Sequence, residues 1–144
     1  MIETYYTKEH GYNPFLIRKG WQVAQLNYTP EQDVKNIIRL DRHNLTDEVF
    51  ILLRGDAVLV AAEVKDNGIE YYMEKLEPMV TYNIPSKVWH NIAMREDCEI
   101  IIVERANTHI DDFEHLDLEL SEIQNFRKKV IACFQPETKI TTNL

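Results

Sequence analysis

The sequence predicts an all-β protein, an antiparallel sandwich or barrel that ends in an α-helix. Three observations support this fold class. Eight or nine short apolar segments follow one another between about residues 14 and 104, and turn residues separate them at regular intervals. After residue 120 the apolar residues instead recur at helical spacing. We therefore expect a core barrel over about residues 14–104 and a helix over about residues 121–134.

Alternation of apolar and polar residues defines the strands in order. Residues 21–28 alternate in the manner of a half-buried strand, and residues 34–43 continue the pattern. Gly55-Asp56 and residues 65–68 have the composition of tight turns between neighbouring strands. The predicted strands are residues 21–28, 34–43, 48–54, 57–64, 69–76, 80–84, 88–94 and 98–104.

The C-terminal helix has its own sequence signals. Ser121 and Gln124 have the spacing of a capping box, with Ser121 as N-cap, and Pro136 is placed to end the helix. We expect the helix to cover an edge or open end of the sheet, or to pack on a partner subunit. One apolar face is predicted, made of Ile123, Phe126, Val130 and Phe134.

Composition limits the function classes. A chain of 144 residues favours a single domain over residues 1–144. The net charge of −8, from 16 basic and 24 acidic residues, argues against nucleic-acid and membrane partners and favours a small-molecule ligand. Cys98 and Cys133 form no CxxC motif, and we find neither a signal peptide nor an apolar run of about 18 residues. These features predict a cytoplasmic protein.

Four residues form a candidate metal site. Asp41 and His43 are two positions apart, so both point to one face of a strand. Glu48 opens the next strand, and His90 lies on a later strand among apolar neighbours. Imidazole and carboxylate ligands suit Fe²⁺, Mn²⁺, Zn²⁺ or Ni²⁺. The alternative is a satisfied polar network inside a barrel that binds no metal.

The spacing of these residues resembles the first motif of the cupin superfamily, which is His-x-His, three or four residues, Glu, six residues, Gly. Asp41, His43, Glu48 and Gly55 have every spacing of that motif, with Asp41 in place of the first histidine. The resemblance covers roughly residues 34–104. It implies a double-stranded β-helix (jelly-roll) barrel, in agreement with the strand count.

The second cupin motif is only partly present. Pro85 and His90 fit it, whereas both glycines are missing and Met94 stands where the motif ends in Asn. The usual cupin ligands are three histidines and one glutamate. This chain offers two histidines and two carboxylates, or a triad of two histidines and one carboxylate with Asp41 as an orienting residue.

Other residues are weaker candidates for a substrate pocket. Arg39 shares the predicted inward face of Asp41 and suits a substrate carboxylate, although an ion pair with Asp41 is the alternative. Phe50 and Tyr82 are candidates for the pocket wall or for the core. A polar loop is expected over residues 109–115.

Three classes of function remain open on this evidence. The first is a metal-dependent enzyme acting on a small organic molecule, such as a dioxygenase, isomerase or lyase. The second is a non-catalytic module with a degenerate metal site, and the third is a scaffold. We also expect a homodimer, because the strand over residues 48–54 is apolar on both faces and each face needs cover.

Overall fold

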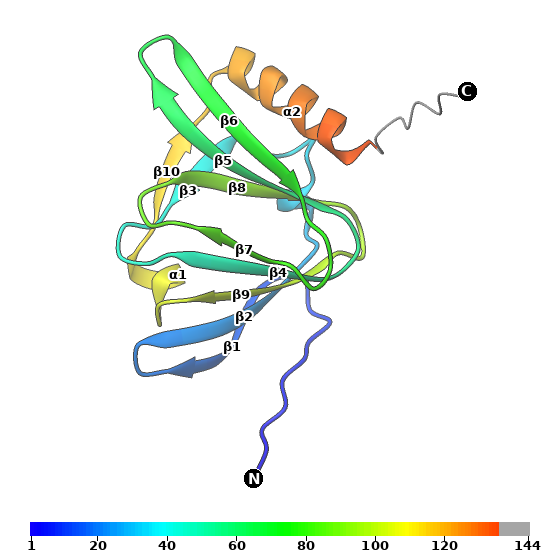
Figure 1. Cartoon of the computed structure of the whole chain (residues 1–144), viewed down its shortest axis with the longest axis vertical. Coiled ribbons are helices and arrows are strands. Elements are labelled where there is room, and N and C mark those ends of the chain that lie inside the picture. The colour runs from blue at the N-terminus through cyan, green and yellow to red at the C-terminus, as the bar shows by residue number, and fades with distance from the viewer. Residues whose placement is uncertain (136–144) are drawn as a thin grey trace, which may run out of the picture.

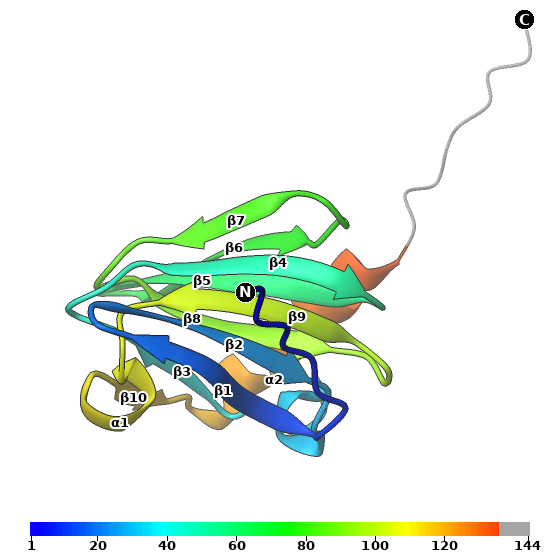
Figure 2. The ribbon, with the colours of Figure 1, turned by 90° about the horizontal axis from the view of Figure 1, so that it is seen from below.

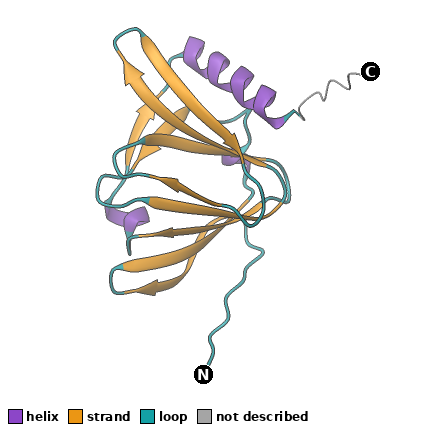
Figure 3. Ribbon diagram, in the orientation of Figure 1, coloured by secondary structure: helices purple, strands orange, loops and turns teal. Residues whose placement is uncertain are grey.

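The strands form two five-stranded sheets that lie face to face, and the C-terminal helix lies on the outside of one of them (Figures 1 and 3). The computed structural model describes residues 1–135. One sheet has the strand order β1-β2-β9-β4-β7 and the other the order β10-β3-β8-β5-β6. All pairings between neighbouring strands are antiparallel. The predicted all-β fold class is therefore confirmed.

Most strands lie where alternation predicted them. The elements are β1 Gly11–Arg18, β2 Trp21–Asn27, the 3₁₀ turn η1 Pro30–Gln32, β3 Arg39–Arg42, β4 Glu48–Arg54, β5 Ala57–Lys65, β6 Gly68–Lys75, β7 Thr81–Ile84, β8 Trp89–Met94, β9 Glu99–Glu104, α1 Thr108–Asp111, β10 Glu114–Asp117 and α2 Leu120–Phe134. From β4 to β9 the predicted and observed bounds differ by one residue at most. The sequence signal is strong there because each strand has one face in the core.

The predicted strand over residues 34–43 is too long. Only Arg39–Arg42 is extended, because Pro30 starts the turn η1 and residues 34–36 form further turns. Val34 and Ile37 are buried all the same, and they pack beneath helix α2. These two apolar residues serve the packing against α2. In the sequence they look like the apolar positions of a strand.

The polar loop predicted over residues 109–115 is also wrong. Helix α1 occupies Thr108–Asp111, and β10 follows and pairs with β3 at the edge of the sheet. His115 pairs with Asp41 in this register. Strand β10 is short and mostly polar, so alternation did not reveal it. This strand brings new side chains to the predicted site.

Two apolar cores hold the layers together. The first lies between the sheets, with Phe50, Met94 and Ile100 among its most buried members. The second lies between helix α2 and the outer face of the β5–β6 side of the other sheet (Figure 1). The predicted apolar face of the helix is confirmed: Phe126, Val130 and Phe134 are buried, and Ile123 packs against the same cluster.

The start of helix α2 differs from the prediction. Glu119 is the N-cap, without a side-chain capping bond, and Ser121 already lies within the first turn. Leu118 is the last residue tied to the sheet, through its N–H to the Ile38 carbonyl, so the chain enters the helix immediately after it. Pro136, predicted to end the helix, lies outside the described residues. Within residues 1–135, no helix has the length and apolar character needed to span a membrane.

Gly55 generates a prediction about stability. Its φ is +85°, and a Cβ added there would lie 2.7 Å from the Cα of Cys98. Gly20 has a similar φ of +89° with no atom near its added Cβ. Both changes to alanine strain the backbone, by roughly 1–3 kcal/mol, but only Gly55→Ala also displaces the backbone at Cys98, just before β9. Urea unfolding is expected to show a larger loss for Gly55→Ala than for Gly20→Ala. Equal losses would contradict the close contact.

Candidate metal centre

Three side chains meet between the two sheets with their potential metal ligands close together. Ring nitrogens of His43 and His90 and a carboxylate oxygen of Glu48 all lie within 4.8 Å of one another. Glu48 Oε2 is 2.8 Å from His90 Nε2 and 3.1 Å from His43 Nε2. Glu48 begins β4 in one sheet, His90 lies on β8 in the other, and His43 directly follows β3. The strands of both sheets thus build the site.

Each imidazole is oriented by its other nitrogen. His43 Nδ1 is 2.6 Å from the carbonyl oxygen of Asp112, and His90 Nδ1 is 2.9 Å from that of Val88. A carbonyl oxygen only accepts hydrogen bonds, so both Nδ1 atoms carry a proton. In the neutral rings the Nε2 lone pairs then point toward Glu48. A carboxylate and two lone pairs at this distance repel one another unless protons or a cation lie between them.

The charges of the three groups are tightly linked. Burial would lower the pKa of His43, but its hydrogen bond with Glu48 and the charge of that carboxylate outweigh burial and raise the pKa to about 9. The same opposition raises the pKa of His90. Burial would raise the pKa of Glu48, whereas its bonds with the two histidines lower it. Without a metal, the cluster therefore holds protons on its histidines.

Asp112 fixes the chain around His43. Its two carboxylate oxygens accept the N–H groups of Asn44 and Leu45, each at 2.9 Å, while its own carbonyl accepts from His43. The side chain is buried in the connection between α1 and β10. Sequence reasoning missed this residue, since nothing local links it to a loop 68 residues earlier. Its position is a typical one for a residue that orients a metal ligand.

Asp41 is not part of the convergent group. His115 Nδ1 lies 2.6 Å from its carboxylate, and both residues sit on the inward side of the sheet beside His90. The unpredicted strand β10 supplies this histidine. Of the four sequence-predicted ligands, the structure brings three together. They are the histidines and glutamate of the alternative triad, and no hydrogen bond within residues 1–135 joins Asp41 to them.

A second buried network adjoins the triad, and the sequence did not reveal it. The Glu104 side chain accepts hydrogen bonds from the Tyr12 hydroxyl and from Gln22, both at Oε1. Gln22 also lies 3.1 Å from His109. Burial, followed by the negative charge of Glu48, raises the pKa of Glu104. The other oxygen, Oε2, lies 3.9 Å from His43 Nε2.

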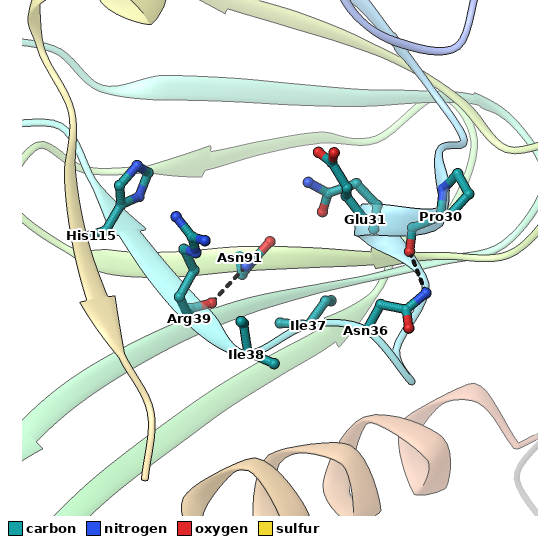
Figure 4. Close-up of a pocket in the computed structure, with 9 residues that line it drawn as sticks. Pro30, Glu31, Asn36, Ile37, Ile38, Arg39, Asn91 and His115 are labelled. Carbon is teal, nitrogen blue, oxygen red and sulfur yellow. Dashed lines mark hydrogen bonds between the residues drawn. The ribbon is translucent and has the colours of Figure 1, made fainter. Parts of the chain in front are cut away.

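The predicted pocket residues do not share one cavity. Arg39 and His115 extend from neighbouring strands to line a cavity of about 480 Å³, together with residues around η1 and with Asn91 (Figure 4). Phe50 is buried between the sheets, with its ring edge-on to His90 at 6.4 Å between centroids. Tyr82 faces the same core on β7, and its hydroxyl accepts the Glu77 N–H. Phe50 is therefore a core residue, and the half-buried Tyr82 packs against the same core.

Comparison with known proteins agrees on the fold. No protein family and no curated protein sequence matches the chain. Among solved structures, Streptomyces PAC13 with uridine is 12% identical, with a TM-score of 0.55 over 85% of this chain and 98% of that one. The QdtA 3,4-ketoisomerase of Thermoanaerobacterium thermosaccharolyticum with TDP is 19% identical, with a TM-score of 0.50 over 78% and 75%.

A third similar structure is a cupin-2 domain protein of Shewanella frigidimarina, 20% identical, with a TM-score of 0.46 over 69% of this chain and 84% of that one. The chain shares the fold of the two structures with TM-scores of 0.50 and above: its two facing antiparallel sheets form the jelly-roll barrel that the motif spacing implied. At these identities the likeness concerns the fold alone.

The protonated cluster predicts how the stability of the metal-free protein depends on pH. The folded pKa of His43, about 9, lies above its ordinary value of 6.5, so this stabilisation is complete below pH 6.5 and is lost as the pH rises to 9. In EDTA, urea unfolding is expected to show a loss of about 1–3 kcal/mol from this group over that range. The loss should be smaller in His43→Gln. A difference between the two proteins that does not change with pH would contradict the assignment.

Proposed function

We propose that this protein holds a divalent metal ion with His43, Glu48 and His90, and that it acts on or binds a small organic molecule beside that ion. The observation that carries the proposal is the convergence of two oriented Nε2 atoms on one buried carboxylate. Both Nδ1–H groups are engaged by backbone carbonyls, so the ligand atoms are already aimed before an ion enters. Such outer contacts commonly accompany metal ligands in proteins.

The donor set favours particular ions and chemistry. Two imidazoles and one carboxylate suit Fe²⁺, Mn²⁺, Zn²⁺ or Ni²⁺ and leave room for further ligands. A bound ion of this kind would supply a Lewis acid, or with iron a centre for dioxygen chemistry. The proposed activity is therefore that of a metal-dependent isomerase, lyase or dioxygenase.

Arg39 favours a substrate that carries an anionic group. Asp41, its alternative partner, is engaged by His115, and within residues 1–135 Arg39 forms no ion pair. Its guanidinium group lines an open cavity one row of side chains away from His90, about 7 Å along the strand. A planar guanidinium group binds carboxylates and phosphates with two parallel hydrogen bonds. We propose that Arg39 holds the anionic end of the ligand.

A non-catalytic module with a degenerate metal site is the second candidate. Two observations favour it. Asp41 stands where cupins have a histidine and is turned to His115, and protonated His43 and His90 satisfy Glu48 without an ion. In this case the cluster would be a buried ion-pair network that stabilises the barrel or a ligand pocket.

Metal analysis separates the two candidates. Protein purified without a chelator or a metal-affinity step is expected to contain about one transition-metal ion per chain. His90→Ala is expected to lose most of this ion, because it removes one of two imidazoles. His10→Ala, which changes an exposed histidine far from the site, is the matched control. Circular dichroism checks that the variants fold. Wild-type protein that takes up no Fe²⁺, Mn²⁺, Zn²⁺ or Ni²⁺ would favour the non-catalytic module.

We also propose that two copies pair through the outer face of the β1–β7 sheet. Helix α2 covers the other sheet and lies behind β1, β2 and β9 in the view of Figure 2. The outer face of the β1–β7 sheet instead carries half-buried apolar side chains on the adjacent strands β2, β9 and β4. The N-terminal segment covers only part of it, where Thr7 bonds to Gln25 and Asn27. Apolar faces of this extent usually mark interfaces. The side chains of this face are Val23, Val49, Ile51, Ile101 and Val103.

The proposed pairing predicts a measurable mass. Light scattering at micromolar concentration is expected to give about twice the chain mass of 17.0 kDa. Ile51→Lys places a charge in the centre of this face and is expected to give the mass of one chain. Lys35→Gln, at an exposed site away from the face, should leave the dimer intact. A wild-type protein with the mass of one chain would contradict the pairing.

A further inference from the structure

Glu104 has a buried carboxylate of which one oxygen lacks a hydrogen-bond partner in the described part of the chain. Its side chain is only 2% exposed. Oε1 accepts hydrogen bonds from Tyr12 and Gln22, whereas Oε2 has no hydrogen-bond partner within residues 1–135. The nearest group of opposite charge is His43 Nε2 at 3.9 Å, beyond hydrogen-bond reach. A buried acceptor without a partner is costly, so it points to an absent one.

The unpartnered oxygen faces the candidate metal centre. Val49 pairs with Val103 in the antiparallel register, so Glu48, one residue before Val49, and Glu104, one residue after Val103, are neighbours on the inward face. Tyr12 and Gln22 hold the other oxygen, Oε1, whereas Oε2 is the oxygen that approaches His43 Nε2. Glu104 therefore borders the triad without belonging to its closest group.

The charge balance of the site indicates why a second carboxylate at Glu104 would matter. With neutral histidines, a divalent cation beside Glu48 alone leaves one positive charge buried between the sheets. A buried charge without a counter-charge is strongly unfavourable. A second carboxylate brings the total to zero, and Glu104 is the other buried acid on this face next to the triad.

We propose that Glu104 is the second carboxylate of the cation site, with Oε2 as the oxygen that faces the bound ion. This inference rests on the proposed metal centre. It assigns to Glu104, on β9, the counter-charge that the first-motif position, Asp41, does not provide in this structure. The resulting site has two imidazoles and two carboxylates. It should favour Mn²⁺ more than a site with one carboxylate does, because Mn²⁺ prefers oxygen ligands and Ni²⁺ suits imidazole.

The alternative role for Glu104 is a plain ion pair with protonated His43. In that case Glu104 would affect the stability of the metal-free protein but would not affect the choice between metal ions. The ratio of the affinities for Mn²⁺ and Ni²⁺ therefore separates the two roles.

The experiment measures binding of Mn²⁺ and of Ni²⁺ to the full chain by calorimetry. Glu104→Gln keeps the shape and removes the charge. It is expected to weaken Mn²⁺ binding about 10- to 100-fold and Ni²⁺ binding by a clearly smaller factor. Glu104→Asp keeps the charge and should recover part of the Mn²⁺ affinity. It also provides a second variant if Glu104→Gln does not fold.

Glu99→Gln is the matched control. Glu99 is a buried acid on the same strand, but it faces the other side of the sheet, where Tyr6 donates to it. Both affinities should stay unchanged in this variant. Equal losses for the two ions in Glu104→Gln, or no loss, would overturn the role of Glu104 while leaving the metal centre intact. Wild-type protein that binds neither ion would overturn the metal centre and this inference with it.

Discussion

The burial of one carboxylate is the constraint on which this structure depends. Glu48 lies between the two sheets with almost no contact with water, where an unpaired charge is strongly unfavourable. Its position is stable only because His43 and His90 reach it from the other side of the barrel. These contacts tie β4 to β8 and to the end of β3. The proposed metal site and the junction of the two sheets are therefore the same group of atoms.

Backbone carbonyl groups orient the imidazole rings of both histidines. His90 bonds to the carbonyl of Val88, the residue just before β8, so its orientation comes from the backbone next to it. His43 depends on Asp112, which lies in the connection to β10 and also holds the two N–H groups that follow His43. The C-terminal part of the chain thus acts on the site through this loop. Without it, the turn after β3 would lose the three hydrogen bonds that Asp112 makes to His43, Asn44 and Leu45.

Sequence reasoning found the parts of the site that local pattern encodes. Alternation assigns a residue to one face of a strand, and motif spacing assigned Glu48 and His90 to the inward face. Neither kind of pattern indicates which strand lies opposite. Tyr12 and Glu104 are 92 residues apart, and Asp41 and His115 are 74 apart. The partner of Asp41 lies on β10, whose polar sequence does not resemble a strand. The sequence therefore predicted that the Asp41 carboxylate binds the metal, whereas in the structure that carboxylate pairs with His115 on β10.

The buried ionisable residues between the sheets are not the set that stability alone would favour. Replacing a buried ion pair with apolar residues is often neutral or stabilising. This barrel instead retains Glu48 and Glu104 between its sheets, and within residues 1–135 their ion-pair partners are the side chains of His43 and His90. In the metal-free state one oxygen of Glu104 remains unsatisfied. An apolar residue such as Leu at this position would remove that penalty, whereas Gln would still leave a buried polar atom there. The unsatisfied oxygen therefore favours a cation site over a purely structural cluster.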